Sequence, residues 1–190
     1  MYQSVTAESR EIYIVITRTG TLLSKIIGKV SNATYNHASV SLDSELRTMY
    51  SFGRLHAYNP IIGGFVMEGP DFGTFKRFHE ADAIVLRVPV TEAQYQELSA
   101  CLKSMYAEKR QYHYNLPGLV LAGVGIVWRR QNWYYCSEFV RDILDRFSIL
   151  DANEYNAIVK PEDFLEGYEV VYTGKLREYA LHKPMLQRAV

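Results

Sequence analysis

The chain has 190 residues, 48% of them hydrophobic, and its 21 basic and 21 acidic residues give a formal net charge of zero. A chain of this size and composition can bury a core without disulfides or metal, so we expect a single domain over residues 1–190. Zero net charge excludes a global positive field that would recruit nucleic acid, and small or peptide-like substrates fit better.

Cysteine and histidine usage gives no sign of a metal or redox site. Cys101 and Cys136 lack the paired spacing of such motifs and are too few for a disulfide scaffold. The N-terminus, Met1 to Glu11, contains no apolar run and no recognisable secretory signal, so we expect a reducing, cytoplasmic location. Four histidines fall at irregular intervals, and neither a metal nor another cofactor is predicted: His56, His79, His113 and His182.

The chain opens with the pattern of a strand followed by a short helix. Glu11–Thr17 is a β-branched and aromatic run that ends before a turn at Gly20, which predicts a buried strand. After Thr21, an apolar stripe predicts a short helix: Leu22, Leu23, Ile26 and Ile27.

A second strand is predicted where His37 alternates with apolar residues. In the stretch 35–43, His37, Ser39 and Ser41 share one face, and Ala38 and Val40 lie on the other. Small hydroxyls beside an imidazole suggest the wall of a cleft, because a buried polar face needs hydrogen-bond partners. An exposed strand face fits the same pattern.

A hairpin is expected to follow. Arg47–Gly53 predicts an antiparallel strand after a turn near Asp43, which would bring Ser51, within one residue, opposite His37. Stretch 59–64 contains Asn-Pro and Gly-Gly pairs and predicts a loop. Phe65–Glu68 then reads as a strand that ends on Glu68.

Another strand and a long helix occupy the middle of the chain. Ala83–Val90 predicts a strand whose Pro89 lies at an edge. Thr91 and Gln94 have the spacing of a capping box, and the helix is expected to continue to Arg110. Cys101 borders the buried stripe of this helix, so we interpret it as core packing.

Leu116–Trp128 is an apolar run interrupted by a proline and three glycines. It is too short to span a bilayer, which takes about 20 apolar residues, and no transmembrane segment is predicted. We interpret the run as a buried helix beneath a cleft, with a lipid-facing surface as the alternative.

The stretch 133–140 places a cysteine at the start of a helix. From Cys136 onward, apolar residues recur at spacings of three and four, with charged residues between them. A helix N-terminus can lower the pKa of a thiol from about 8.5 to between about 3.5 and 7.5, which favours the nucleophilic thiolate. The alternative is a small buried hydrophobic residue, the commoner role of a free cysteine.

A short helix with Pro161 in its first turn and a strand over Glu169–Tyr172 complete the pattern. Strands dominate the first half of the chain and helices the second, with no repeat and no linker. This order predicts an α+β fold with an antiparallel sheet packed against helices.

Two stretches also carry a family resemblance: Asn36 to Asp43, around His37, and Tyr135 to Val140, around Cys136. They resemble the circularly permuted, papain-like cysteine hydrolases of the NlpC-type superfamily, in the YiiX/YebB-like branch, whose distant relatives include lecithin retinol acyltransferase. In that group the histidine strand precedes the cysteine helix. The resemblance covers most of the chain and implies a permuted papain-like fold.

The resemblance implies a thiolate–imidazolium pair in which His37 accepts the Cys136 proton and an acyl group rests on sulfur. The backbone N–H of Cys136 would stabilise the oxyanion, with Tyr134 or Tyr135 as the source of a second donor. The residue that orients the imidazole departs from the simple pattern. Ser51 and Glu68 are both candidates, and Glu68 is favoured because a carboxylate stabilises an imidazolium.

Three functions are compatible with these residues. The first is a cysteine amidase or peptidase that acts on a peptide, a cell-wall peptide or an acyl amino acid. The second is a lipid acyltransferase or lipid-processing enzyme, for which lipid is a possible partner because of the apolar Leu116–Trp128 run. The third is a non-catalytic binding module on the same fold.

Overall fold

The computed structural model describes residues 9–19, 34–56 and 59–179. Its framework is one eight-stranded sheet with the order β7-β6-β4-β3-β2-β1-β5-β8. The strands are β1 (Ser9–Arg18), β2 (His37–Ser41), β3 (Met49–His56), β4 (Asn59–Glu68), β5 (Asp82–Thr91), β6 (His113–Tyr114), β7 (Trp133–Tyr134) and β8 (Glu169–Lys175). All neighbours pair antiparallel except β6 and β7.

In the described part of the chain, α-helices and 3-10 turns accompany the sheet, so the fold is α+β as expected. They are α2 (Thr74–Arg77), α3 (Glu92–Ala107), η1 (Lys109–Gln111), α4 (Leu116–Ala122), α5 (Cys136–Arg146), η2 (Ala152–Glu154) and η3 (Pro161–Glu166). Within the described residues, no helix is long and apolar enough to cross a bilayer. The helix expected over 22–27 lies outside the described residues.

The central strand β1 is buried on both faces, which explains its continuous apolar run. Ile12, Ile14 and Ile16 belong to the main core, and Tyr13 and Val15 belong to a second core on the opposite face. Because successive side chains of a strand point to opposite faces, one uninterrupted apolar run can serve two cores.

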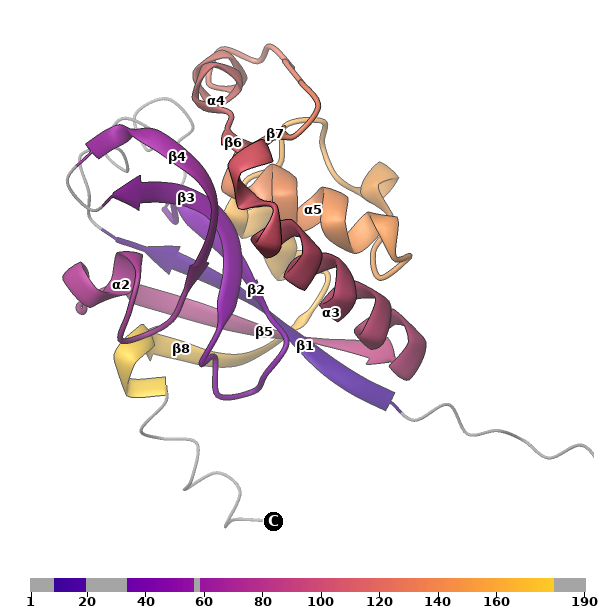
Figure 1. Ribbon diagram of the computed structural model, residues 1–190. Helices are drawn as coiled ribbons and strands as arrows, with labels where there is room; N and C mark the ends of the chain where they lie inside the picture. The colour runs from indigo at the N-terminus through magenta and orange to yellow at the C-terminus, as the bar shows by residue number, and fades with distance from the viewer. Residues whose placement is uncertain (1–8, 20–33, 57–58, 180–190) are drawn as a thin grey trace, which may run out of the picture.

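The main core lies between the sheet and the helices α3 and α5, which cover the same face (Figure 1). α3 begins at the predicted capping box, in which the Thr91 side chain accepts a hydrogen bond from the Gln94 N–H. Cys101 of α3 is half-buried and packs at the margin of this core, as predicted.

The second core covers the other face of the sheet and contains Phe75 of α2 together with Val85 of β5. It is completed by Leu176 and Tyr179, which follow β8. The polar residues His37, Ser39 and Ser41 of β2 are buried on this side, because Ala38 and Val40 belong to the main core. They are therefore not an exposed strand face.

Two expectations about strands β3 and β4 are wrong. The stretch 59–64 is part of β4, not a loop, and its glycines are used where β6 approaches: a Cβ on Gly63 would lie 2.6 Å from the Tyr114 Cβ. Ser51 is not opposite His37. The pairing of Ser41 with Met49 and of Val40 with Tyr50 places Ser39 opposite Ser51 and His37 opposite Gly53.

The register follows from the turn between β2 and β3. The Asp43 side chain accepts hydrogen bonds from the backbone N–H groups of Glu45, Arg47 and Thr48, at 3.0 to 3.3 Å. This Asp-centred turn delays the start of β3 to Met49, and the delay shifts Ser51 by two residues from the expected register.

The apolar run 116–128 also differs from the expected buried helix. Only Leu116–Ala122 is helical, as α4, and the residues after it form a loop with exposed apolar side chains. In Figure 1, α4 and this loop stand at one end of the molecule, beyond the layer formed by α3 and α5.

Candidate active site

Cys136 is the first residue of α5, as the sequence predicts. The preceding Tyr135 is extended, and its backbone N–H donates to the Glu138 side chain at 3.4 Å, so Glu138 caps the helix start. The first N–H groups of a helix have no intrahelical acceptor. The thiol therefore lies beside backbone donors at the positive end of a helix dipole.

The N-terminal half of α5 is held in place by the segment before η3. The Ser137 hydroxyl donates to the Val159 carbonyl at 2.7 Å. The buried Arg141 guanidinium donates to the carbonyl oxygens of Asn156, at 3.3 Å, and Ala157, at 3.1 Å. These bonds fix the position of the Cys136 helix against the rest of the fold.

His37 begins β2, and the backbone just before it is fixed on two sides. The Asn36 N–H donates to the Thr17 carbonyl at 3.1 Å, and the Tyr35 N–H donates to Glu162 Oε1 at 2.9 Å. The Cys136 Sγ lies 3.9 Å from the Asn36 carbonyl oxygen. The start of the histidine strand and the start of the cysteine helix thus meet.

Glu68, the last residue of β4, pairs with His37. Its Oε1 lies 2.5 Å from His37 Nε2 and also accepts a hydrogen bond from the Ser39 hydroxyl at 2.8 Å. Because Nε2 faces Glu68, Nδ1 is the ring nitrogen left for Cys136. The sequence-predicted residues Cys136, His37 and Glu68 are therefore brought together in that order.

Burial and ion pairing shift the pKa values of His37 and Glu68 in opposite directions. Burial lowers the pKa of His37, but the charge of Glu68 and hydrogen bonds to Cys136 and Glu68 outweigh it and raise the pKa to about 10. Burial also raises the pKa of Glu68, whereas the charge and hydrogen bond of His37, with Ser39 and Thr74, lower it overall. His37 and Glu68 therefore form a buried ion pair at neutral pH.

Small residues make room for this pair. Glu68 lies opposite Met49, four positions along β3 from Gly53, which lies opposite His37. A Cβ on Gly53 would lie 3.7 Å from His37 Cε1 and 3.3 Å from the Val66 Cγ2. The Glu68 side chain thus reaches His37 diagonally across a stretch of sheet that carries serine and glycine.

Ser51, the other candidate for orienting the imidazole, is engaged elsewhere. Its hydroxyl donates to the Ala38 carbonyl at 2.6 Å, and the residue is fully buried. The bond links β3 to β2 next to His37. Ser51 therefore supports the backbone of the histidine strand, whereas Glu68 contacts the imidazole.

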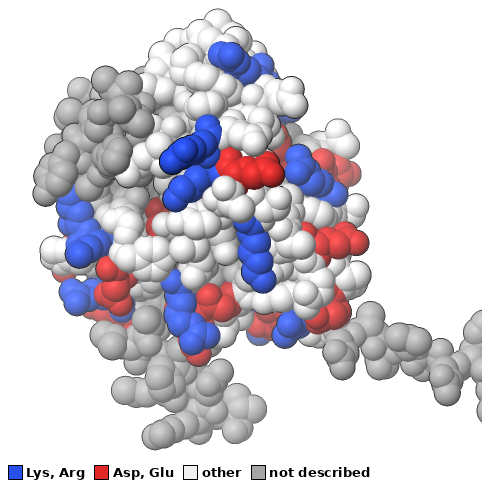
Figure 2. Space-filling model, in the orientation of Figure 1, with Lys and Arg blue, Asp and Glu red and all other residues white. Residues whose placement is uncertain are grey.

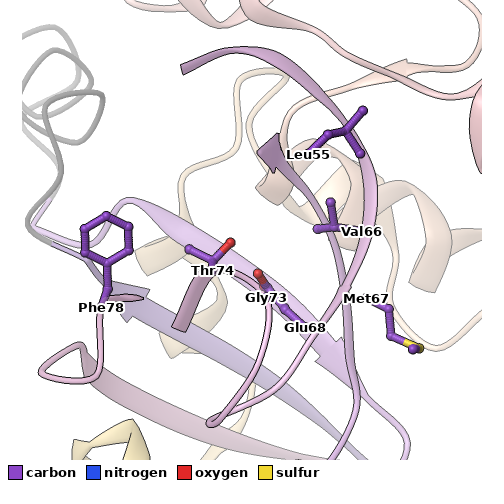
Figure 3. Close-up of a pocket in the computed structure, with 7 residues that line it drawn as sticks. All are labelled: Leu55, Val66, Met67, Glu68, Gly73, Thr74 and Phe78. Carbon is purple, nitrogen blue, oxygen red and sulfur yellow. The ribbon is translucent and has the colours of Figure 1, made fainter. Parts of the chain in front are cut away.

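A cavity of about 160 Å³ adjoins the Glu68 carboxylate. Figure 3 shows the carboxylate and the Thr74 hydroxyl pointing toward one another at its edge. Polar groups beside a cavity of this size meet the requirements for buried water. The lining residues are Leu55, Val66, Met67, Glu68, Gly73, Thr74 and Phe78.

The two tyrosines before Cys136 have structural partners. The Tyr134 ring packs 5.2 Å from the Phe52 ring and belongs to the margin of the main core. The Tyr135 ring is buried, and its backbone N–H is bound by Glu138. Burial, together with the charge of Asp142, raises the pKa of Glu138 to about 7, so this helix cap titrates near neutrality.

Of the remaining histidines, His113 is engaged in another contact. His113 packs against Trp133, with ring centroids 5.1 Å apart, and His182 lies outside the described residues. Among the residues that the structure describes, no group of three or more His, Cys, Asp and Glu side chains is arranged to hold a metal ion.

Sequence reasoning missed three contributors to the site. Ser39 shares a face with His37 in the strand pattern, and this was the signal for its contact with Glu68. Thr74 and Arg141 gave no such signal, because the first lies in a glycine-rich turn and the second occupies a helix position that pattern assigns to the surface. Only the folded arrangement buries Arg141 against the 156–157 carbonyls.

Comparison with known proteins adds no assignment. No family model matches the chain, and neither a curated protein nor a solved structure matches it.

Proposed function

We propose that the protein is a cysteine hydrolase that cleaves an amide bond in a peptide-like or acylated substrate. The observation that carries the proposal is the chain of contacts at one site: Cys136 at a helix start, His37 beside it, and a buried Glu68 on the far nitrogen of the imidazole. This is the arrangement in which a cysteine is activated by a base that a third group orients.

In the first half of the reaction, the Cys136 sulfur attacks the substrate carbonyl as a thiolate, because its proton is already held on His37 in the thiolate–imidazolium pair. The Cys136 backbone N–H, at the start of α5, stabilises the oxyanion. His37 then donates its proton to the leaving amine, and the acyl group remains on sulfur as a thioester. The ion pair with Glu68 holds the imidazolium charge during this step.

In the second half, water attacks the thioester. His37, now neutral, accepts a proton from this water, and the Cys136 sulfur leaves as the acid product is released. Glu68 remains charged throughout and acts as a positioning residue. No cofactor takes part.

The order of the elements supports a place in the permuted papain-like group of the NlpC-type superfamily. The histidine strand β2 precedes the cysteine helix α5 in the chain, and α5 packs against an antiparallel sheet. The motifs around His37 and Cys136 support the same assignment.

The test is a screen of peptides, acyl amino acids and thioesters with wild type, Cys136→Ala and Cys101→Ala. The two free cysteines form a matched pair, and only Cys101 lies away from His37. We expect Cys136→Ala to lose at least about 10³-fold in kcat/KM and Cys101→Ala to retain activity. Equal activity of wild type and Cys136→Ala on every substrate that is turned over contradicts the proposal and favours a non-catalytic module.

A second candidate is an acyltransferase in which a lipid supplies or accepts the acyl group. The observation that favours it is the exposed apolar loop after α4, which lies between β6 and β7 and so leads directly to Cys136. Both candidates share the thioester. Transfer of the acyl group to an amine or alcohol in preference to water would select the second candidate.

A further inference from the structure

The strongest feature outside the candidate active site is a group of exposed apolar side chains on α4 and the loop that follows it. We call this group the apolar tip. Its members, with the exposed fraction of each residue, are Val120 (56%), Val124 (71%), Ile126 (51%), Val127 (47%) and Trp128 (36%). Exposed apolar residues gathered in one segment mark an interaction site, whereas single ones carry no such meaning.

Side-chain hydrogen bonds hold the backbone of the apolar tip in a defined conformation. At its base, the buried Asn115 side chain accepts a hydrogen bond from the Gly118 N–H at 2.9 Å and donates to the Trp128 carbonyl at 3.1 Å. A Cβ on Gly118 would lie 2.2 Å from the Asn115 side chain, so this position requires glycine. Asn115 thereby joins the two ends of the segment.

The turn at the far end is also hydrogen-bonded. The Val124 and Ile126 N–H groups both donate to the Leu121 carbonyl at 3.0 Å, and Gly125 adopts a left-handed φ of 80° between them. With the backbone satisfied locally, the apolar side chains extend outward and not into the core.

Within the segment that carries the apolar tip, the charged residues are all basic. No acidic residue occurs between Glu108 and Glu138, and Arg129 and Arg130 follow Trp128 directly. Arg130 stacks over the Trp133 ring at 4.7 Å, and Arg129 lies 3.7 Å from Glu138, whose pKa is raised. Figure 2 shows the end of the molecule that carries α4 as a white surface with blue beside it and no red on it.

Exposure falls in order along the loop, from Val124 through Ile126 and Val127 to Trp128, and the arginines come next. This is the order of depth in a bilayer interface: aliphatic side chains deepest, tryptophan at the boundary, and cationic groups at the phosphates. A protein partner would need a groove that accepts this end of the molecule. The fall in exposed fraction from Val124 to Trp128 does not require such a groove.

We infer that the apolar tip docks the protein on an anionic lipid bilayer. Docking would hold the chain in the interface without crossing it, because α4 has only seven residues. Trp128 is joined to Cys136 through a short loop and β7, so the docked surface lies next in the chain to the candidate nucleophile. The inference does not rest on the proposed function.

The experiment measures cosedimentation of the full chain with vesicles of phosphatidylcholine, alone or mixed with phosphatidylglycerol. We expect binding to the anionic vesicles, and Val124→Asp and Ile126→Asp should each weaken it by about tenfold or more. Val170→Asp is the matched control, since Val170 is about as exposed as Ile126 (49% against 51%) but lies on β8. It should bind as wild type does.

Tryptophan fluorescence reports the same event directly. The chain has two tryptophans, and Trp133→Phe leaves Trp128 as the only reporter. We expect its emission to shift to shorter wavelength with anionic vesicles and to be quenched by brominated lipid. Cys136→Ala should bind as tightly as wild type, which separates docking from catalysis.

Three results would overturn the inference. One is the absence of cosedimentation and of a Trp128 shift with either vesicle. Another is equal binding by wild type, Val124→Asp and Ile126→Asp. The third is a wild-type dimer that Val124→Asp converts to a monomer without any vesicle binding, because the apolar tip would then be covered by a second copy of the chain.

Discussion

At the scale of single residues, the site depends on one buried ion pair. The Glu68 carboxylate is fully buried, and His37 is its charged partner. Because the pKa of His37 is raised to about 10, the stabilisation from its charge is complete below its ordinary value of 6.5 and is lost as the pH rises toward 10. Because the pKa of Glu68 is lowered, its contribution is complete above 4.5 and is lost as the pH falls below that value.

The stabilising contributions of His37 and Glu68 are both complete only between pH 4.5 and pH 6.5, the ordinary pKa values of the two groups. Glu68→Gln should therefore reduce stability most in this pH range. We expect it to reduce the free energy of unfolding by about 3 kcal/mol near pH 5.5, because it leaves a buried imidazolium without its partner. The loss should shrink as the pH rises to about 10. Urea unfolding near pH 5.5 and near pH 10 measures the loss of stability. Glu92→Gln, which removes the carboxylate of the exposed Arg10–Glu92 ion pair, is the control and should change stability little.

Ser51→Ala separates support of the strand from contact with the imidazole. We expect it to reduce stability by about 1 to 3 kcal/mol, because the buried Ala38 carbonyl loses a donor. The pH profile of Cys136 alkylation should remain that of wild type. A profile that moves as much in Ser51→Ala as in Glu68→Gln would show that Ser51, and not only Glu68, orients His37.

At the scale of elements, α5 presents its first residue because its N-terminal half is tied to the 156–159 segment. Arg141→Met should reduce the free energy of unfolding by about 3 kcal/mol, since two buried carbonyl groups lose their donors. Thermal unfolding measures this. Arg146→Met, at the exposed end of the same helix, is the matched control, and an equal loss in the two variants would contradict the structural role of Arg141.

The elements themselves were largely predictable. Strand β1 and the helices α3 and α5 follow from local periodicity and from caps that lie within four residues of the helix start. The glycine-rich half of β4 could not be predicted from local periodicity. Its glycines allow the close approach of β6, which lies about 50 residues further along the chain. α4 was predicted to be buried because apolar content alone does not say which surface a segment covers.

At the scale of the whole molecule, one sheet separates two cores, and the candidate site lies at their boundary. The pairing of β2 with β3 at this site could not be predicted from the sequence, because the register depends on how Asp43 shapes the turn between them. A shift of two residues places Gly53, and not Ser51, opposite His37. That Cys136 and Glu68 both lie next to His37 likewise depends on contacts between distant parts of the chain.

If the two cores belong to one cooperative unit, a cavity in either should weaken the whole. Phe75→Ala in the second core and Phe139→Ala in the main core each remove a buried ring, and we expect each to reduce stability by about 3 to 5 kcal/mol. Both should shift a single transition seen by far-UV and near-UV circular dichroism. Two separate transitions, each moved by only one variant, would contradict this account.

The most direct test of the site is the rate of Cys136 alkylation by iodoacetamide as a function of pH, measured in a Cys101→Ala background. We predict a rate that stays high well below about pH 8 in the parent, and a profile displaced to higher pH in His37→Ala and in Glu68→Gln. This result would establish a thiolate held by the His37–Glu68 pair. If all three profiles rise only near about pH 8.5, where a free thiol ionises, the catalytic account is contradicted.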